Sequence, residues 1–399
     1  MNKRKFGLLP RVFLAIVCGI VFGFFVPDAI VRIFVTFNSL FGEFLGFVVP
    51  LIIIGLVVPA IADLGKGAGT LLIVTALIAY GSTVLSGLFT YFSCYISLPH
   101  LIPDSGGLST LADQSPLEAL TPFFNVKFPP AIDVMSGLVL SFILGLGLAF
   151  INGNTLKNAM FDFKDIIEKL IHKIIVPLLP VYIFGVFLSM SQAGQVFHIL
   201  GLFMRVILVI FLLQVLLLLF QFFIAGFIAK KNPFRLLKNM LPAYFTALGT
   251  SSSAATIPVT LDQTIRNGVK EDVANFVIPL CATIHLSGST MKIVAFSMAL
   301  MIMQGMPVEF PVFAGFIFML GLTMVAAPGV PGGAIVAALG LIQSMLGFDE
   351  NTQALMVALY IAIDSFGTAC NVTGDGAIAV IMDRIVQFKE KLHSRRQAG

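Results

Sequence analysis

Long apolar stretches fill the chain from end to end, and only short polar segments interrupt them. Eight stretches are of spanning length for helices, which need about 20 mainly apolar residues to cross a bilayer. They lie near residues 12–25, 34–61, 70–98, 136–151, 174–190, 197–229, 273–303 and 352–385. These stretches predict an all-α integral membrane protein. We expect no soluble domain within it, because no polar segment is long enough to fold alone.

Two further apolar segments are interrupted in the middle by small and polar residues. Residues 243–260 contain Gly249-Thr-Ser-Ser-Ser253, and residues 313–346 contain Ala327-Pro-Gly-Val-Pro-Gly-Gly333. Since backbone polar groups cannot face lipid, both segments are predicted to form re-entrant helical hairpins. The first is expected to enter from the cytoplasm and the second from outside. Plain helices with Gly- and Ser-rich kinks are the alternative.

Each interrupted segment is followed by a span with a polar mid-section. These mid-sections are His285-Leu-Ser-Gly-Ser289 and Asn371-Val-Thr-Gly-Asp375. A unit of hairpin and broken span therefore occurs twice, with opposite topology. Inverted repeats of this kind are typical of secondary transporters with a binding site near the middle of the membrane. The pairing favours hairpins over isolated kinks.

Polar residues also follow one face of the last span. Thr368, Asn371 and Asp375 come four, seven and eleven positions after Asp364, so all four lie on one side of an α-helix. Ionisable groups at membrane depth usually line a substrate or ion path. Asp375 could instead cap or snorkel near a helix end, but Asp364 has apolar sequence on both sides.

The composition agrees with a membrane protein. The chain has 399 residues, of which 58% are hydrophobic and 11% charged, whereas a soluble domain has about 25% charged residues. The net charge of +4 therefore indicates membrane orientation and not nucleic-acid binding.

Basic residues gather at both termini and after the fourth and sixth spans. They are Lys3, Arg4, Lys5, Lys157, Lys164, Lys169, Lys173, Lys230, Lys231, Arg235, Lys238, Lys389, Lys391, Arg395 and Arg396. By the positive-inside rule, these segments face the cytoplasm and the loop 99–130 lies outside. We therefore expect a multi-pass protein of the cell membrane with both termini in the cytoplasm.

Other chemistry is poorly supported by the sequence. The four cysteines show neither metal nor disulfide spacing, so we expect no cofactor. His285 with Ser287 or Ser289 would be a hydrolase pair, but residues two apart on a helix point to opposite sides and the other pair lacks an orienting acid. Because the hydrolase pair is poorly supported, we expect a protein that is not an enzyme. A channel would show polar stripes in several spans, whereas the polar residues here concentrate in the C-terminal half.

The hairpin tips and the last span carry a family resemblance. Residues 250–258, 327–333 and 371–375 resemble the two hairpin tips and the eighth-span motif of the dicarboxylate/amino-acid:cation symporter family, the glutamate-transporter homologues. The resemblance covers the whole chain in span order and is strongest over its last 160 or so residues. It implies eight spans, two hairpins, a homotrimer in membrane lipid and an elevator mechanism.

The resemblance also implies a division into domains. Residues 1–69 form scaffold spans 1 and 2, and residues 70–98 form span 3 of the transport domain. Residues 99–196 hold the outer loop and scaffold spans 4 and 5. Residues 197–387 complete the transport domain, and residues 388–399 form a cytoplasmic tail.

Substrate contacts are implied residue by residue. The hairpin tips and Asn371 would bind a carboxylate, Asp364 would bind the substrate ammonium, and Thr368 would border the pocket. The full expected set is Ser252, Ser253, Ser289, Val330, Pro331, Gly332, Asp364, Gly367, Thr368 and Asn371. A buried ammonium needs such an anion beside it.

Sodium is the expected coupling ion, because hard cations prefer oxygen ligands. Asn371 and Asp375 would bind one ion, with weaker signals at His285, Ser287 and Thr83. In the family motif, Ser287 replaces an aspartate and His285 an asparagine. Because histidine titrates near neutral pH, proton coupling is the alternative.

Two departures from the family pattern bear on the substrate. Gly367 stands where members that carry acidic substrates have an arginine, and Ser251 supplies none. We therefore expect a sodium-coupled symporter of small, preferably neutral amino acids. Sodium- or proton-coupled transport of dicarboxylates or acidic amino acids is the alternative. Lys292 could pair with a carboxylate, replace a sodium ion, attract an acidic substrate or snorkel.

Overall fold

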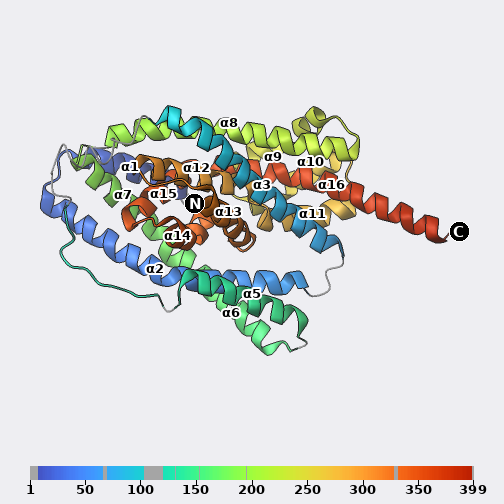
Figure 1. Ribbon diagram of the computed structural model, residues 1–399, viewed down its shortest axis with the longest axis horizontal. Coiled ribbons are helices and arrows are strands. Elements are labelled where there is room, and N and C mark those ends of the chain that lie inside the picture. The colour runs from blue at the N-terminus through green and yellow to red at the C-terminus, as the bar shows by residue number, and fades with distance from the viewer. Residues whose placement is uncertain are drawn as a thin grey trace, which may run out of the picture.

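The structure is a computed structural model that describes residues 8–65, 70–102, 120–130, 132–151, 153–194, 196–327 and 331–397. All regular structure within these ranges is helical (Figure 1). Helices cover each of the predicted apolar runs and both interrupted segments. The basic residues at positions 3–5 and the predicted site residue Val330 lie outside the described residues.

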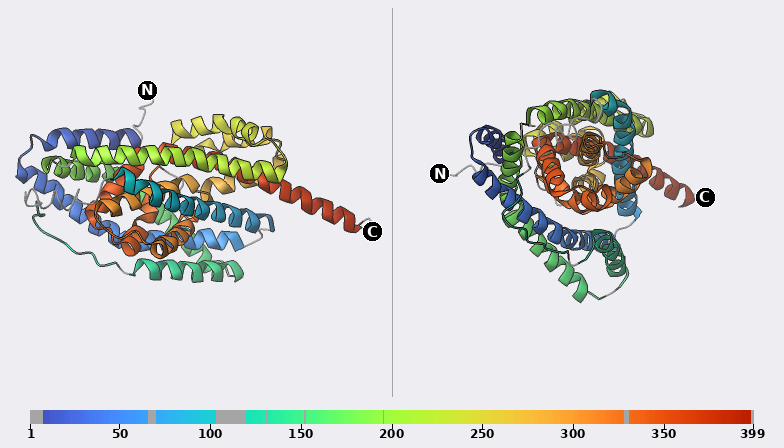
Figure 2. Two further views of the ribbon diagram at one scale, coloured as in Figure 1. Left: turned by 45° about the horizontal axis from the view of Figure 1, so that its top comes forward. Right: turned by 60° about the vertical axis from the view of Figure 1, so that its left-hand side comes forward.

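One group of helices comes mainly from the N-terminal half of the chain. Its members are α1 (Leu8–Gly23), α2 (Asp28–Gly65), α5 (Val134–Phe150), α6 (Thr155–Leu170) and α7 (Val176–Gln192). α2 packs along α5, and α1 packs along α7. Figure 2 shows these helices together on one side of the molecule.

The helix of the fifth predicted span begins earlier than expected. The amphipathic helix α6 continues through a π-helical turn, Ile171–Ile175, into α7. The sequence suggested only a basic cytoplasmic segment before residue 174. Because α6 buries Ile167 while its charged residues face outward, it is helical without being apolar enough to read as a span.

The second group of helices contains the two hairpins and the helices that pack around them. It consists of α3 (Thr70–Leu101), α8 (Val196–Ala229), α9 (Pro233–Thr250), α10 (Ser253–Arg266), α11 (Glu271–Ile284), α12 (Ser287–Met303), α13 (Phe310–Val325), α14 (Gly333–Leu346), α15 (Glu350–Ala362) and α16 (Asp364–Gln397). Hairpin 1 is α9 and α10, which pack on α11 and α16. Hairpin 2 is α13 and α14, and α14 also packs against α2 and α5 of the first group.

Two of the predicted spans are broken in the middle. The break between α11 and α12 falls at His285 and Leu286, where it was predicted. The second prediction was wrong in position. The chain bends by 61° between α15 and α16, and the break is at Ile363 instead of within residues 371–375. Thr373 Oγ1 donates to the Ala369 carbonyl 2.7 Å away, so its polar group is satisfied inside a continuous helix.

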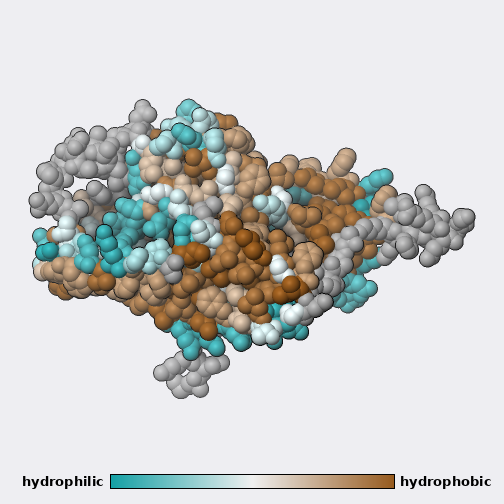
Figure 3. Space-filling model, turned by 60° about the horizontal axis from the view of Figure 1, so that its bottom comes forward, coloured by the Kyte–Doolittle hydropathy of each residue, from teal (hydrophilic) through white to brown (hydrophobic). Residues whose placement is uncertain are grey.

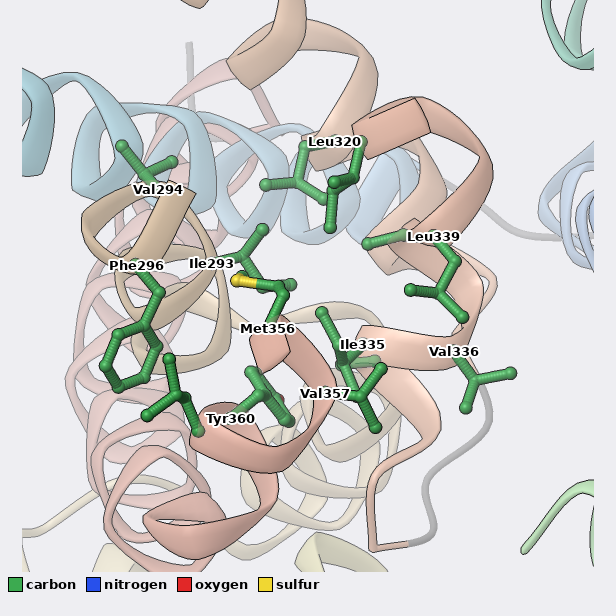
Figure 4. Packing of buried hydrophobic residues seen from close by; sticks show 14 of the residues in the cluster. Ile293, Val294, Phe296, Leu320, Ile335, Val336, Leu339, Met356, Val357 and Tyr360 are labelled. Atoms are coloured by element: carbon green, nitrogen blue, oxygen red, sulfur yellow. The ribbon is translucent and has the colours of Figure 1, made fainter. Parts of the chain in front are cut away.

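Helix α12 forms the centre of the second group. Every residue of α12 except Ile302 is buried. Figure 4 shows Ile293 of α12, Ile335 of α14 and Met356 and Val357 of α15 in one apolar cluster. A helix that is buried on all sides keeps its polar residues away from water, which favours partners within the protein. Among the described residues, Thr290 Oγ1 and Ser297 Oγ of α12 have none.

The outer surface is strongly apolar. Figure 3 shows hydrophobic residues over a broad central area of one face, with hydrophilic residues towards its edges. An area of this size is typical of a surface that meets lipid or another protein. Among the described residues, five helices are long and apolar enough to cross a membrane, and the bent pair α15 and α16 would be a sixth. α1, α5, α13 and α14 are shorter apolar helices.

Candidate functional site

The broken spans and hairpin 2 bring three helix N-termini together. Gly332 at the start of α14 contacts Asp364 at the start of α16, and Gly288 at the start of α12 contacts Asn371 of α16. Helix N-termini carry unpaired N–H groups and the positive end of the helix dipole. The polar motifs, although far apart in sequence, therefore lie around one region that suits an anionic group.

Asn371 joins α16 to the start of α12. Its Oδ1 accepts hydrogen bonds from the backbone N–H groups of Gly288 at 2.7 Å and Ser289 at 3.3 Å. Its Nδ2 donates to Ser289 Oγ at 3.0 Å. The side chain thus caps α12 in the way that an N-cap residue of the same helix would. Both predicted substrate residues, Ser289 and Asn371, are in direct contact.

Glycine is required at position 288 for this contact. A Cβ atom there would lie 2.6 Å from Cys370 Cβ and 2.7 Å from the Gly367 carbonyl oxygen. The backbone of α12 therefore approaches α16 more closely than any other residue type allows.

Asp364 links hairpin 2 to α12. Its Oδ1 lies 3.0 Å from Lys292 Nζ, and its Oδ2 accepts from the Gly332 N–H at 2.8 Å. Gly332 has a φ angle of 76°, which glycine adopts readily, and this turn aims its N–H at the carboxylate. One carboxylate therefore holds both the lysine and the hairpin tip.

Lys292 is fully buried and does not snorkel. Its side chain has no exposed surface, and its ammonium lies 3.7 Å from the centre of the Tyr360 ring. The Ile363 carbonyl lies 3.5 Å away at the C-terminal end of α15. An ion pair, an aromatic face and a helix C-terminus all favour a positive charge here.

Gly367 provides the space that the lysine occupies. A Cβ atom at position 367 would lie 2.6 Å from Lys292 Nζ and would also meet its Cε. The Lys292 ammonium therefore occupies the space where the side chain of an arginine at position 367 would begin. The sequence left the role of Lys292 open, and the structure places its charge beside both Gly367 and Asp364.

A second buried pair lies further along α16. His285 Nδ1 lies 2.8 Å from Asp375 Oδ1, and neither side chain is more than 1% exposed. On the other side of the ring, Nε2 lies 3.0 Å from Ser82 Oγ of α3. Gln221 Nε2 of α8 donates to Ser82 Oγ at 3.1 Å. Four helices thus contribute to one polar network.

Ser287, at the start of α12 beside Gly288, also belongs to the polar network around His285. Its carbonyl accepts from Ser86 Oγ at 2.7 Å, and its hydroxyl accepts from Gln221 Nε2 at 3.3 Å. Gln221 Oε1 is buried and has no hydrogen-bond partner among the described residues. Carbonyl, hydroxyl and amide oxygens of this kind are ligands that sodium accepts.

The serine-rich tip of hairpin 1 makes hydrogen bonds within the hairpin. Ser252 is the N-cap of α10 and accepts from the Ala255 N–H at 3.3 Å. Ser253 begins α10 and is buried. In hairpin 2, the predicted residue Pro331 is half-buried beside Gly332.

Two predicted threonines donate to their own helices. Thr83 Oγ1 donates to the Ala79 carbonyl at 2.9 Å, and Thr368 Oγ1 donates to the Asp364 carbonyl at 3.1 Å. In α3, the neighbour Ser82 instead reaches His285 at the break between α11 and α12, and Ser86 reaches Ser287 at the start of α12.

Sequence reasoning missed Ser82, Ser86, Gln221 and Tyr360. Ser82 and Ser86 are four residues apart in one span, which places both on one helical face. Gln221 is a polar residue inside a long apolar run. These features were available as signals, because polar groups inside spans usually find buried partners. Nothing in the sequence distinguishes Tyr360 from a core aromatic residue.

The family model of the sodium:dicarboxylate symporter family matches residues 8–385. The chain belongs to this family. Membership confirms the resemblance found at the hairpin tips and in the last span. It also agrees with the expectation of a transporter rather than the hydrolase that His285 and its serine neighbours suggested as an alternative.

Curated relatives with similar sequences are transporters. The serine/threonine transporter SstT of Acinetobacter baylyi is 27% identical over 406 residues, which cover 95% of this chain and 98% of that protein. An excitatory amino acid transporter of Caenorhabditis elegans is 26% identical over 69% of this chain and 55% of its own length. Excitatory amino acid transporter 2 of Homo sapiens is 27% identical over 63% of this chain and 44% of its own length.

Proposed function

We propose that this protein is a secondary active symporter that moves a small, preferably neutral amino acid into the cell, driven by a sodium gradient. Family membership and the transporter relatives support the functional class. The observation that carries the substrate assignment is the buried Asp364 carboxylate at the meeting point of α12, α14 and α16.

An amino acid has two charged groups that need separate partners. The Asp364 carboxylate suits the ammonium, because a buried cation requires a close anion. The N-termini of α12 and α14 suit the carboxylate, because their N–H groups and dipoles favour negative charge. Asn371 lies between them, bonded to the start of α12.

The balance of charge favours a neutral amino acid. Lys292 and Asp364 together have no net charge, and a zwitterion adds none. An acidic amino acid would add one negative charge to a buried site, where an unpaired charge is costly. Gly367 offers no second cation. The name of the serine/threonine relative, which matches along nearly its whole length, points the same way.

We propose an elevator mechanism in which residues 70–98 and 197–387 move as a transport domain against a scaffold of residues 1–69 and 99–196. The packing of hairpin 2 against α2 and α5, with hairpin 1 on α11 and α16, supports this division. In this proposal the scaffold also makes a homotrimer, and eight spans leave both termini in the cytoplasm.

Sodium coupling would use Asp375 together with the oxygens of Ser287 and Gln221. A cation that binds Asp375 at Oδ1 would compete with His285 for that oxygen. Because Ser287 replaces the aspartate of the family motif, we propose fewer coupled ions than in family members that keep it. Proton coupling through His285 is the alternative.

One observation favours the alternative substrate class. The Lys292 ammonium lies at the position that Gly367 leaves open, where it would attract a second carboxylate of an acidic amino acid or a dicarboxylate. In that case Lys292 binds the carboxylate that an arginine at position 367 binds in family members with acidic substrates.

Uptake into proteoliposomes tests the proposal. Serine, threonine, alanine, aspartate, glutamate and succinate should be offered with sodium and proton gradients imposed separately. We expect sodium-driven uptake of a neutral amino acid. Best uptake of an acidic substrate would establish the alternative, and uptake that needs only a proton gradient would exclude sodium coupling.

A further inference from the structure

The Lys292 ammonium binds Asp364 as the ammonium of a substrate would. It meets Oδ1, while the other oxygen of the same carboxylate accepts from the Gly332 N–H of hairpin 2. Lys292 and Gly332 come from different helices and use different oxygens, so the lysine and the closed hairpin tip are compatible. Asp364, which would bind the substrate ammonium, is therefore in direct contact with both Lys292 and the start of α14.

A carrier that returns empty across the membrane faces an electrostatic problem. Without substrate, Asp364 would be a buried carboxylate with no cation, and such a charge draws water or holds the site open. Lys292 can neutralise Asp364 in the empty carrier, because its buried ammonium lies 3.0 Å from that carboxylate.

We propose that Lys292 is a built-in counter-cation that replaces the substrate ammonium in the empty carrier, so that hairpin 2 closes on Asp364 and the empty site crosses the membrane. This inference rests on the proposed transport of an amino acid, and adds how the transport cycle is completed. It assigns Lys292 to the return step instead of to the attraction of acidic substrates.

The surroundings of Lys292 allow it to release Asp364 when substrate arrives. The Tyr360 ring lies 3.7 Å from the ammonium, and the carbonyls of Ile363 and Asp364 lie 3.5 Å away. These groups offset part of the cost of a positive charge that has left the carboxylate, but they do not replace the ion pair. The incoming ammonium then takes Oδ1, and the site keeps the same net charge in the loaded and the empty state.

The first experiment compares net uptake with exchange in proteoliposomes. Lys292→Met removes the charge and keeps most of the volume. Net uptake needs the empty carrier to return, whereas exchange of internal for external substrate needs only the loaded one. We expect net uptake to fall about tenfold or more while exchange falls less than about threefold, since a lone buried carboxylate opposes only the empty state. Equal losses in both would overturn the proposal.

The second experiment needs no substrate. A cysteine is placed at the hairpin 2 tip as Pro331→Cys in a variant whose four native cysteines are alanine, and its rate of labelling by a maleimide is measured. Lys292→Met and Asp364→Asn should each speed labelling, because each leaves one buried charge unpaired. The double variant Lys292→Met/Asp364→Asn should return to the parent rate, because neither charge remains.

This pattern separates charge pairing from a merely structural role. If the double variant is labelled faster than both single variants, or if the single variants match the parent, the proposal is wrong. Absence of amino-acid uptake by the wild type would refute the proposed substrate alone, since the labelling experiment judges Lys292 independently.

Discussion

His285 Nδ1 and Asp375 Oδ1 lie 2.8 Å apart at a point that solvent does not reach. An ionised carboxylate only accepts hydrogen bonds, so the ring proton is on Nδ1 when Asp375 is charged. Nε2 then accepts from the Ser82 hydroxyl, which lies 3.0 Å away. The carboxylate that would bind a coupling ion is therefore already held by a side chain of the protein.

Asp375→Asn tests the role of this carboxylate in ion coupling. The change removes the negative charge that favours a cation, so we expect a higher sodium concentration for half-maximal uptake, or loss of transport. Uptake of labelled substrate over a range of sodium concentrations measures the effect. His285→Asn is the matched variant, because it keeps Asp375 and removes its partner. It should lower the sodium concentration that is needed.

The outcome that contradicts sodium coupling is specific. If the wild type takes up substrate equally well in sodium-free buffer with a proton gradient, the ion is a proton. His285 then becomes the leading candidate for the proton-carrying group.

Asp364→Asn should abolish amino-acid uptake, since an amide cannot neutralise a buried ammonium. Size-exclusion chromatography in detergent should show an unchanged particle, because the substitution removes one charge at the site and leaves the size of the side chain nearly unchanged. Undiminished amino-acid uptake would sink the assignment of Asp364. Retained transport of succinate, which has no amine, would support the dicarboxylate alternative.

A side chain at position 367 should change selectivity through Lys292. A Cβ atom there lies 2.6 Å from Lys292 Nζ, so Gly367→Arg needs the space that the lysine fills. We expect Gly367→Arg/Lys292→Ala to shift preference towards aspartate and glutamate, since a guanidinium binds a carboxylate at two points. Competition against labelled substrate measures the shift, and Lys292→Ala alone is the control.

The opposite result in the wild type would refute neutral selectivity. If aspartate, glutamate or succinate displaces the substrate best and Lys292→Met removes that advantage, the lysine has replaced the arginine of acidic-substrate family members.

Gly288→Ala should destabilise the protein. The added methyl group would lie 2.7 Å from the Gly367 carbonyl, and backbone cannot move aside as a flexible side chain does. Overpacking of this kind costs about 1–3 kcal/mol. Thermal unfolding in detergent measures it, with Gly147→Ala as the control, because position 147 is exposed and has open space. An unchanged unfolding temperature would mean that α12 and α16 pack less tightly than they do here.

The sequence by itself determined the helical elements and most of the polar positions. Apolar length predicted the spans, and the Gly-, Pro- and Ser-rich interruptions predicted both hairpins and the break at His285. These are local properties, because a bilayer requires each segment to satisfy its own backbone. Helical periodicity alone also placed Asp364 and Asn371 on one face of α16.

Only the tertiary structure decided how those positions are used. Asn371 reads as a ligand in sequence but caps α12 across 83 positions of the chain, and Ser82 meets His285 across 203 positions. Lys292 had four interpretations until its distance to Asp364 was known. A buried charge or amide takes its role from the partner that folding brings to it, and no local pattern records which distant residue that partner is.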